Sequence, residues 1–291
     1  MTNVTVLGMG IMGAGMAQRL LDKGLAVTVW NRNPARSAPL GEAGARIAAT
    51  AAEAVEGADT VVAMLAEDDA SRAVWLGEGG ALAAMKAGAV AIECSTLTAE
   101  WTRTLAGEAQ ARGVRFLDAP VTGSRVQAAT GALRFFVGGD AATLDRAQPV
   151  LDVLGTESAL LGPNGSGATL KLINNFLCGV QVASLAEAMG AIERSGLDAD
   201  TAVRLLNAGA PASPMVKTMS ARMLAREYDP HFYVPLMAKD LGYAGQTLAG
   251  LGITSDLAAA ARERFLTAER EGFGERDISA VVEPLRGGSG S

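Results

Sequence analysis

The chain has 291 residues, of which 49% are hydrophobic and 35 are glycine, so it is long enough for two domains with a large core. Its formal net charge of −6 argues against nucleic acid as a main partner. The two cysteines, Cys94 and Cys178, have no metal-ligand spacing, so we expect no metal site and a reducing, cytoplasmic environment. No signal-peptide pattern opens the sequence. The most apolar window, 172–192, contains polar residues, which favours a buried helix over a membrane span.

A glycine-rich turn lies between the first expected strand, 3–7, and the first expected helix. The turn reads Gly-Met-Gly-Ile-Met-Gly at 8–13, and a second expected strand, 26–30, follows the helix. In that context the three glycines predict a dinucleotide site, because they allow a tight turn, close approach to a pyrophosphate and close helix packing. The helix N-terminus then faces the phosphates. The alternative is a glycine-rich turn without a ligand. The residues expected to contact the cofactor here are Gly8, Gly10, Ile11, Met12 and Gly13.

The end of the second strand favours NADP(H) over NAD(H). Enzymes that use NAD usually place Asp or Glu at this point to bind the ribose hydroxyls, whereas this chain has Asn-Arg-Asn-Pro-Ala-Arg at 31–36. Arginine pairs bidentately with phosphate. We therefore expect Arg32 and Arg36 at the 2′-phosphate and Asn31 on the ribose. The alternative is that both arginines lie in a solvated loop.

Strands and helices continue to alternate up to residue 162. This pattern predicts an α/β domain of the Rossmann type, with a mostly parallel, doubly wound sheet. Ligands bind outside the carboxyl ends of such strands, so Leu65, Ser95 and Thr96 are expected near the cofactor or substrate. Capping of the next helix is an equally good interpretation of Ser95 and Thr96. The further strands are expected at 59–65, 89–93, 115–117, 133–137 and 158–161.

Hydroxyl side chains flank a glycine just past the strand at 115–117. Thr122, Gly123 and Ser124 offer hydroxyl and backbone N–H groups to an anion, for example a substrate carboxylate. We therefore expect this loop to belong to the substrate site.

A long helix is expected over 163–196, with Asn164 as its N-cap and Gly196 as its stop. Its length predicts that it joins two domains. Lys171 and Asn175 lie four residues apart, on one face near its start, and could form a catalytic pair.

The rest of the chain has only helical patterns. We therefore expect domains at 1–162 (dinucleotide binding) and 197–286 (all-helical, for substrate and dimerisation), joined by the long helix. The terminal Gly/Ser run, 287–291, is expected to be a linker outside the fold. A small helical domain of this kind often needs a partner, so we expect a homodimer.

Two charges, Lys239 and Asp240, interrupt an otherwise apolar helical run. Buried charges need partners. One interpretation places Lys239 on the cofactor and Asp240 on a helix terminus or another basic group. The alternative is an internal ion pair without a function.

Four motifs in order resemble the β-hydroxyacid dehydrogenase family, which includes 3-hydroxyisobutyrate dehydrogenase and the glyoxylate/succinic semialdehyde reductases. The resemblance covers essentially the whole chain up to the linker. The motifs are the glycine turn at 8–13, Asp-Ala-Pro-Val-Thr-Gly-Ser at 118–124, Gly-x-Gly-x-x-x-Lys-x-x-Asn-Asn at 165–175, and Lys-Asp-Leu at 239–241.

The resemblance implies that Lys171 is the general acid/base and that Thr122, Gly123 and Ser124 grip a substrate carboxylate. It also implies that Asn175 positions the substrate and that Lys239 approaches the cofactor. A lysine ammonium has three donors, so it can polarise a carbonyl oxygen and protonate it as hydride arrives. Burial and a second cation would lower its pKa from about 10.4.

This chain departs from the family pattern at two points. The family commonly has Ser-Gly-Gly at 122–124 and Gly at the position of Gln127. These two departures leave the identity of the substrate unassigned. Ser124 with Asn31 and Arg32 favours the NADPH-dependent reductases of glyoxylate and semialdehydes. We therefore expect an oxidoreductase acting on a small carboxylate-bearing aldehyde, keto acid or β-hydroxy acid. The alternatives are an imine reductase, which usually replaces the lysine with Asp or Tyr, and a non-catalytic NADP-binding protein.

Overall fold

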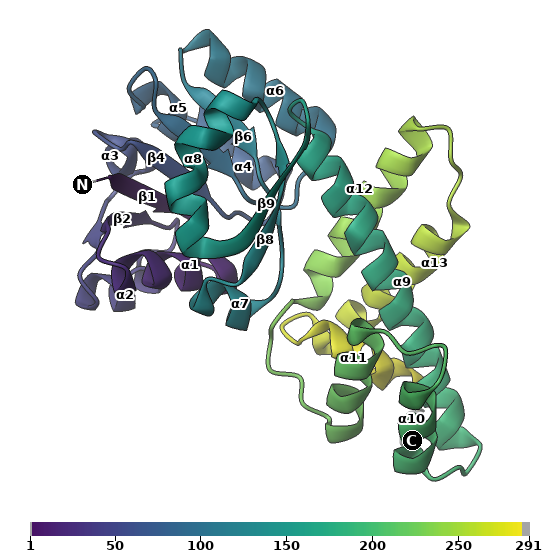
Figure 1. The fold of residues 1–291 in the computed structure, drawn as a ribbon. Coiled ribbons are helices and arrows are strands. Elements are labelled where there is room, and N and C mark those ends of the chain that lie inside the picture. The colour runs from purple at the N-terminus through teal and green to yellow at the C-terminus, as the bar shows by residue number, and fades with distance from the viewer. Residues whose placement is uncertain (1, 287–291) are drawn as a thin grey trace. The chain divides into compact units, whose positions relative to one another are not determined.

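The computed structural model describes residues 2–286, so the expected linker at 287–291 lies outside the described residues. The chain divides into two units after Lys171, inside the long helix α9 (Ser166–Arg194). In Figure 1 the first unit runs from purple to teal and the second continues through green to yellow. Each unit has its own core and is described by itself.

One nine-stranded sheet forms the centre of the first unit, within residues 2–286. The strand order is β3-β2-β1-β4-β5-β6-β8-β7, with β9 paired to β8, and the strands from β3 to β6 are parallel. The order therefore reverses between β1 and β4. The strands are β1 (Asn3–Leu7), β2 (Ala26–Trp30), β3 (Arg46–Ile47), β4 (Thr60–Ala63), β5 (Val90–Glu93), β6 (Arg115–Asp118), β7 (Val121–Thr122), β8 (Leu133–Gly138) and β9 (Gly155–Gly162).

Helices cover both faces of this sheet (Figure 1). Side chains alternate along each strand: Val6 and Val62 join the core beneath α1 and α8, whereas Leu7 and Val61 join the core beneath α3, α5 and α6. Burial on both faces explains the nearly continuous apolar strands and confirms the doubly wound fold. The helices are α1 (Ile11–Asp22), η1 (Pro34–Arg36), α2 (Ala38–Glu42), α3 (Ala51–Val55), α4 (Asp68–Leu76), α5 (Ala81–Ala84), α6 (Ala99–Ala111), α7 (Arg125–Thr130) and α8 (Ala141–Leu154).

The predicted N-cap of the long helix is wrong. Helix α9 begins at Ser166, and the Asn164 amide instead donates to the carbonyl oxygens of Phe116 and Gly138 at 3.3 and 3.1 Å. The acceptor at the helix start is the carboxylate of Asp118, which is distant in sequence. Short elements were also missed, because segments of two to six residues carry too little periodicity. They are β3, α2, β7 and α7.

The second unit is helical throughout its described part, as predicted. Side chains of Asp198, Ser213, Ser255 and Asp277 accept hydrogen bonds from first-turn N–H groups and set the helix starts. Apolar faces meet in one core that includes Met189, Met237 and Phe265. The helices are α10 (Ala199–Ala208), α11 (Pro214–Ala225), α12 (Val234–Gly250), α13 (Asp256–Ala268), the π-turn η2 (Glu269–Phe273) and η3 (Ile278–Leu285).

Helix α9 is also the one described helix long and apolar enough to cross a membrane by length and composition alone. Half of its most apolar window is buried inside the protein. Its apolar side chains Val182, Ala186 and Met189 are fully buried in the core of the second unit. This packing accounts for the apolar composition of the helix.

Candidate active site

The glycine turn after β1 has the shape that a dinucleotide phosphate requires. Gly8 has φ +97°, and a Cβ there would lie 2.3 Å from the Met64 carbonyl oxygen. A Cβ on Gly13 would lie 1.9 Å from the Gly8 oxygen, whereas the space beside Gly10 is open for at least 4 Å. Gly10 is the N-cap of α1 and makes no side-chain cap. The open backbone at the start of a 12-residue helix, beside the point where strand order reverses, fits a pyrophosphate.

Asn31 connects the end of β2 to this turn. Its Oδ1 accepts from the Met9 N–H at 2.9 Å, and its Nδ2 donates to the Asn33 oxygen at 2.8 Å. The side chain therefore fixes the backbone of the turn, and the expected ribose contact stays a prediction. Arg32 and Arg36 are both exposed and form no ion pair with any residue in 2–286. Two solvated guanidinium groups beside the turn are available to an anion.

The exits of β4 and β5 are joined by a hydrogen bond. The Leu65 N–H donates to Ser95 Oγ at 2.7 Å, and Ser95 is 2% exposed. Thr96 is half-buried. Helix α6 is capped by Thr98, whose Oγ1 accepts from the Trp101 N–H at 3.2 Å. The alternative that Ser95 or Thr96 caps this helix is therefore wrong.

In the loop after β7, both hydrogen-bond donors of Ser124 are paired with an acceptor of the same chain. The backbone N–H and the hydroxyl of Ser124 donate to Oε1 of Gln127 at 2.9 and 2.7 Å, forming a capping box at the start of α7. Gly123 has φ +126°. The departure from the family pattern at Gln127 therefore occupies the very groups that were expected to bind a carboxylate.

Lys171 lies half-buried in the first turns of α9. The start of that helix is fixed by Asp118, which is 1% exposed and accepts from the N–H groups of Gly165 and Ala168 at 2.9 and 3.0 Å. A Cβ on Gly167 would lie 2.1 Å from the Phe136 oxygen. The start of the helix therefore packs directly on β8, and Lys171 lies on this helix in the same unit as the glycine turn.

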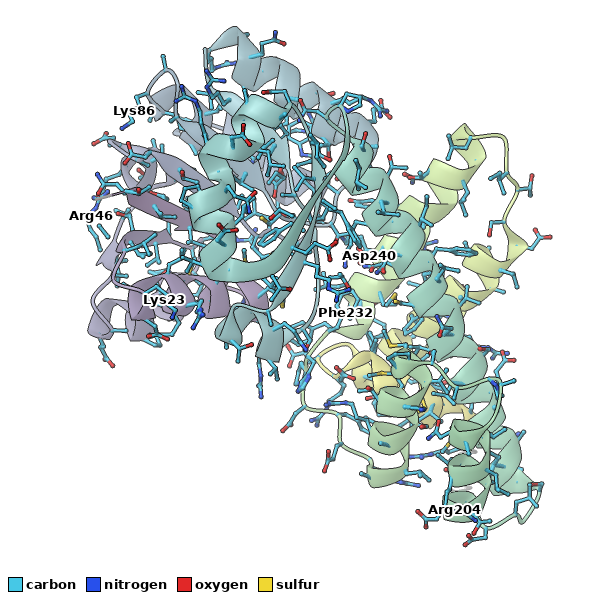
Figure 2. All side chains as sticks on the ribbon, viewed as in Figure 1. Lys23, Arg46, Lys86, Arg204, Phe232 and Asp240 are labelled. Carbon is cyan, nitrogen blue, oxygen red and sulfur yellow. The ribbon has the colours of Figure 1, made fainter. Side chains whose placement is uncertain are left out.

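In the second unit, Asp240 on α12, which is labelled in Figure 2, is 1% exposed and lies among other polar side chains. Its carboxylate is 2.9 Å from Nζ of Lys239 and accepts from Nδ2 of Asn175 at 2.6 Å. Asn174 donates to Asn175 Oδ1 at 2.9 Å, and Lys239 Nζ lies 4.9 Å from the Tyr243 ring centre. Lys239 and Asp240 thus form an ion pair, as the alternative interpretation expected. The proposed roles of Lys239 and Asn175 stay predictions.

Two buried carboxylates beside the expected site were missed from the sequence. Asp118 caps α9, and Glu93, at the end of β5, accepts hydrogen bonds from Ser71, Trp75 and Ser95. Burial raises the pKa of Glu93. Burial and the neighbouring Glu93 charge together raise the pKa of the Cys94 thiol well above its usual value. An acidic residue closing an apolar strand was the available signal, since such a charge must be compensated.

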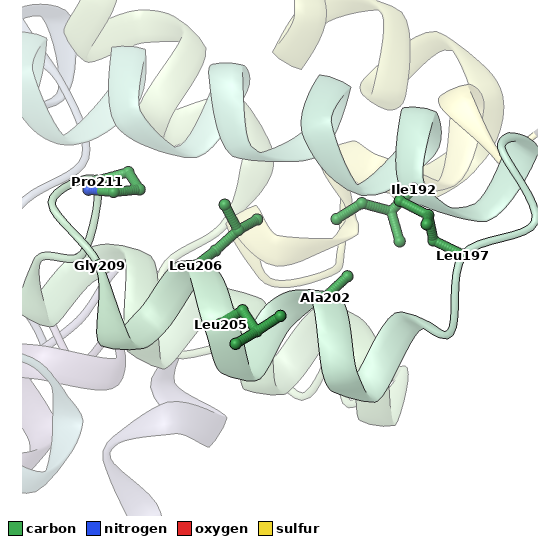
Figure 3. Close-up of a pocket in the computed structure, with 7 residues that line it drawn as sticks. All are labelled: Ile192, Leu197, Ala202, Leu205, Leu206, Gly209 and Pro211. Atoms are coloured by element: carbon green, nitrogen blue, oxygen red, sulfur yellow. The ribbon is translucent and has the colours of Figure 1, made fainter.

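An apolar hollow of about 440 Å³ lies at the far end of α9 and along α10 (Figure 3). None of its lining residues ionises, so it offers no acid, base or anion-binding group. The hollow is lined by Ile192, Leu197, Ala202, Leu205, Leu206, Gly209 and Pro211.

Two family models together match almost the whole described chain. Residues 3–162 match the NAD-binding domain of 6-phosphogluconate dehydrogenase. Residues 165–285 match the NAD-binding domain of NADP-dependent 3-hydroxyisobutyrate dehydrogenase. The chain belongs to the 3-hydroxyisobutyrate dehydrogenase family of β-hydroxyacid dehydrogenases. It is an NAD(P)-dependent dehydrogenase/reductase acting on CH–OH groups.

Several relatives within this 3-hydroxyisobutyrate dehydrogenase family match over nearly their full lengths. Glyoxylate/succinic semialdehyde reductase 1 of Arabidopsis thaliana is 35% identical, covering 97% of this chain and 98% of the relative. The NAD-dependent L-serine dehydrogenase of Pseudomonas aeruginosa is 33% identical, covering 99% and 100%. The crystal structure of 3-hydroxyisobutyrate dehydrogenase from Salmonella typhimurium has a TM-score of 0.90 at 31% identity, covering 98% and 100%. These relatives differ in substrate.

Proposed function

We propose that this protein is an NADPH-dependent reductase of small carboxylate-bearing aldehydes or keto acids, and that it also oxidises the matching hydroxy acids. The observation that carries the proposal is Lys171 on a helix whose start is fixed by Asp118, in the unit that holds the glycine turn. The similarity to a glyoxylate/succinic semialdehyde reductase supports the same substrate class.

Lys171 acts as the general acid/base in this proposal. The bound cofactor supplies or accepts the hydride at the substrate carbon. In reduction the Lys171 ammonium donates a hydrogen bond to the carbonyl oxygen and then transfers a proton to it. In oxidation the neutral amine accepts the proton from the hydroxyl group. A fixed helix start supports this role, since proton transfer needs a donor held within hydrogen-bond reach.

Substrate recognition is assigned to the loop at 122–124 and to Asn175. The Thr122 hydroxyl and the Gly123 N–H offer donors to the carboxylate, and Ser124 joins them when Gln127 releases it. Asn175 orients the substrate with its amide, which Asp240 holds in one direction. Lys239 contacts the cofactor.

NADP(H) is the proposed cofactor. Arg32 and Arg36 are exposed next to the turn that fits the pyrophosphate, and no carboxylate stands at the end of β2 to bind ribose hydroxyls. A guanidinium group pairs well with the additional 2′-phosphate. Names within the family include both an NADP-dependent 3-hydroxyisobutyrate dehydrogenase and an NAD-dependent L-serine dehydrogenase.

We also propose that the protein is a homodimer. Seven of the eleven large hydrophobic side chains that are exposed in residues 2–286 lie in the second unit, and exposed apolar surface commonly marks an interaction site. Sedimentation velocity at micromolar concentration tests this, and a monomer would contradict it. The seven are Leu177, Leu197, Leu205, Leu206, Leu251, Ile253 and Leu257.

A substrate panel tests the proposed reaction. Glyoxylate, succinic semialdehyde, the oxidation substrates 3-hydroxyisobutyrate and L-serine, and a set of cyclic imines are assayed with NADPH/NADP⁺ and NADH/NAD⁺. Turnover of the carboxylate-bearing aldehydes with NADPH is expected. Preference for cyclic imines would replace the proposal with imine reduction, and cofactor binding without turnover on any substrate would favour the non-catalytic alternative.

A further inference from the structure

Glu93 occupies a closed polar cluster beneath the proposed cofactor site. The side chain is 1% exposed, and the three side chains that contact it are also buried: Ser71, Trp75 and Ser95 are 0%, 1% and 2% exposed. They come from helix α4 and from the exit of β5. A carboxyl group enclosed in this way is stable only if its oxygens are satisfied by hydrogen bonds.

Four donors converge on the two oxygens of Glu93. Oε2 accepts from Ser71 Oγ and from Trp75 Nε1, both at 2.8 Å. Oε1 accepts from the Ser95 N–H at 3.1 Å and from the Ser95 hydroxyl. An indole N–H and a backbone N–H can only donate. Each oxygen therefore faces one obligatory donor, and the cluster requires a side chain that accepts at both positions.

Ser95 connects this cluster to the residues that follow β4, the neighbouring strand. Because its hydroxyl proton points at Glu93, the Ser95 oxygen presents a lone pair to the Leu65 N–H, which donates to it at 2.7 Å. Leu65 follows β4 and lies against the glycine turn: a Cβ on Gly8 would lie 2.3 Å from the Met64 oxygen and 3.0 Å from Leu65 Cδ2. The cluster is thus connected to the turn by contacts within the first unit.

The connection reaches the place where a ligand binds in this fold. Strand order reverses between β1 and β4, and in open parallel sheets the ligand lies outside the carboxyl ends of the strands at that reversal. The carboxyl ends of β1 and β4 are followed by Gly8 and by Met64 and Leu65.

We propose that Glu93 is a positioning residue for the dinucleotide: it orients the Ser95 hydroxyl, which holds the exit of β4 against the glycine turn. The inference rests on the proposed cofactor site. Glu93 does not touch the cofactor in this scheme, because it is enclosed by its own donors. Its effect is transmitted through one hydroxyl group and one backbone N–H.

Two serines provide a matched test, because both donate a hydroxyl to Glu93 and only Ser95 also accepts from Leu65. Ser95→Ala and Ser71→Ala each remove one buried hydrogen bond to the carboxylate, so both are expected to lower the melting temperature, Ser95→Ala by more because it also removes the acceptor of the Leu65 N–H. Ser95→Ala is expected to raise the NADPH dissociation constant by about tenfold, the equivalent of a hydrogen bond lost at the site. Ser71→Ala is expected to change it by less than about twofold. Titration calorimetry on the purified full chain measures both.

A second pair of variants tests the acceptor requirement while Ser95 is kept. In Glu93→Gln the amide NH₂ must face either the Trp75 N–H or the Ser95 N–H, and NADPH is expected to bind about tenfold more weakly. Trp75→Phe added to Glu93→Gln removes one obligatory donor, so the amide can face Ser71 while its oxygen keeps both contacts to Ser95. The double variant is expected to regain NADPH affinity within about threefold of the wild type, even if the lost indole lowers its melting temperature.

Equal effects of Ser71→Ala and Ser95→Ala on the dissociation constant would overturn the proposal and make the cluster purely structural. A Glu93→Gln protein with wild-type affinity, or a double variant weaker than Glu93→Gln, would overturn it as well. Failure of the wild type to bind either NADPH or NADH is a different result. It would remove the proposed cofactor site itself.

Discussion

The carboxylate of Asp118, at the end of β6, accepts a hydrogen bond from the backbone N–H of Ala168 at 3.0 Å in the first turn of α9. A cap supplied from 50 residues away ties the helix that carries Lys171 to the end of a sheet strand. Negative charge at a helix N-terminus is also favourable. The contact therefore links the fold to the proposed chemistry, because it fixes the position of the helix that carries Lys171.

Asp118→Asn tests the contact. The amide keeps one acceptor where the carboxylate serves two N–H groups, so we expect a loss of about 1–3 kcal/mol in the free energy of unfolding and a fall in kcat of about tenfold or more through misplacement of Lys171. Asp140→Asn is the control, because Asp140 also caps a helix of the first unit, α8, by accepting from the Thr143 N–H at 2.9 Å. It should lose about 1 kcal/mol and keep kcat. Equal kcat values for the two variants would contradict the prediction.

Lys171→Ala is expected to lower kcat by about 10²–10⁴-fold on the best substrate, because general acid/base catalysis contributes that much. NADPH affinity should stay within about threefold. Lys171→Arg keeps the positive charge but cannot release a proton near neutral pH, so it should be nearly as inactive. Steady-state kinetics and titration calorimetry measure the two effects. Near-normal turnover by either variant would remove Lys171 from the mechanism.

Arg32→Ala tests the cofactor preference. If the guanidinium pairs with the 2′-phosphate, the Michaelis constant for NADPH should rise by about tenfold or more, whereas that for NADH should change little. Arg112→Ala is the control, since Arg112 pairs with Glu108 on α6 at 2.5 Å and has no part in the proposed site. Equal changes for NADPH and NADH would mean that Arg32 does not contact the 2′-phosphate.

Gln127→Ala removes the acceptor that holds both donors of Ser124. We expect the Michaelis constant for carboxylate-bearing substrates to fall several-fold, although α7 loses a cap worth about 1 kcal/mol. Gln127→Glu keeps an acceptor and adds a negative charge, so it should raise that constant while leaving an uncharged aldehyde unaffected. Unchanged constants in both variants would place the substrate carboxylate elsewhere.

The buried Glu93 carboxyl predicts a pH dependence of stability. Burial raises its pKa above the ordinary value of 4.5, so the folded state binds more protons than the unfolded chain above pH 4.5. The stability that the protonated Glu93 carboxyl contributes is fully present below pH 4.5. It is lost as the pH rises through the folded-state pKa. Glu93→Gln cannot titrate. Its free energy of unfolding, measured by urea denaturation from pH 4.5 to 8, should therefore fall less with pH than that of the wild type. Parallel profiles would contradict this.

Local sequence patterns predicted the order of the longer elements in this protein, although not the short elements β3, α2, β7 and α7. Alternating apolar runs and the glycines at 8–13 predicted the doubly wound sheet, and the purely helical patterns after residue 196 predicted the helical second unit, where Ser213 and Ser255 cap their own helices. Such signals are local. A cap lies within three residues of the N–H it serves, and a strand reveals its burial by its own composition.

The pairing of polar groups from distant parts of the chain depends on the tertiary fold. Asp118 replaced the predicted cap Asn164, and Glu93 is joined through Ser95 to Leu65, just after the neighbouring strand β4. Asn175 bonds with Asp240, 65 positions away. A hydrogen bond depends on directions and distances within about 3 Å, and for residues so far apart in the chain these are set by strand order and helix packing. The periodicity and spacing of the sequence therefore do not predict these long-range hydrogen bonds.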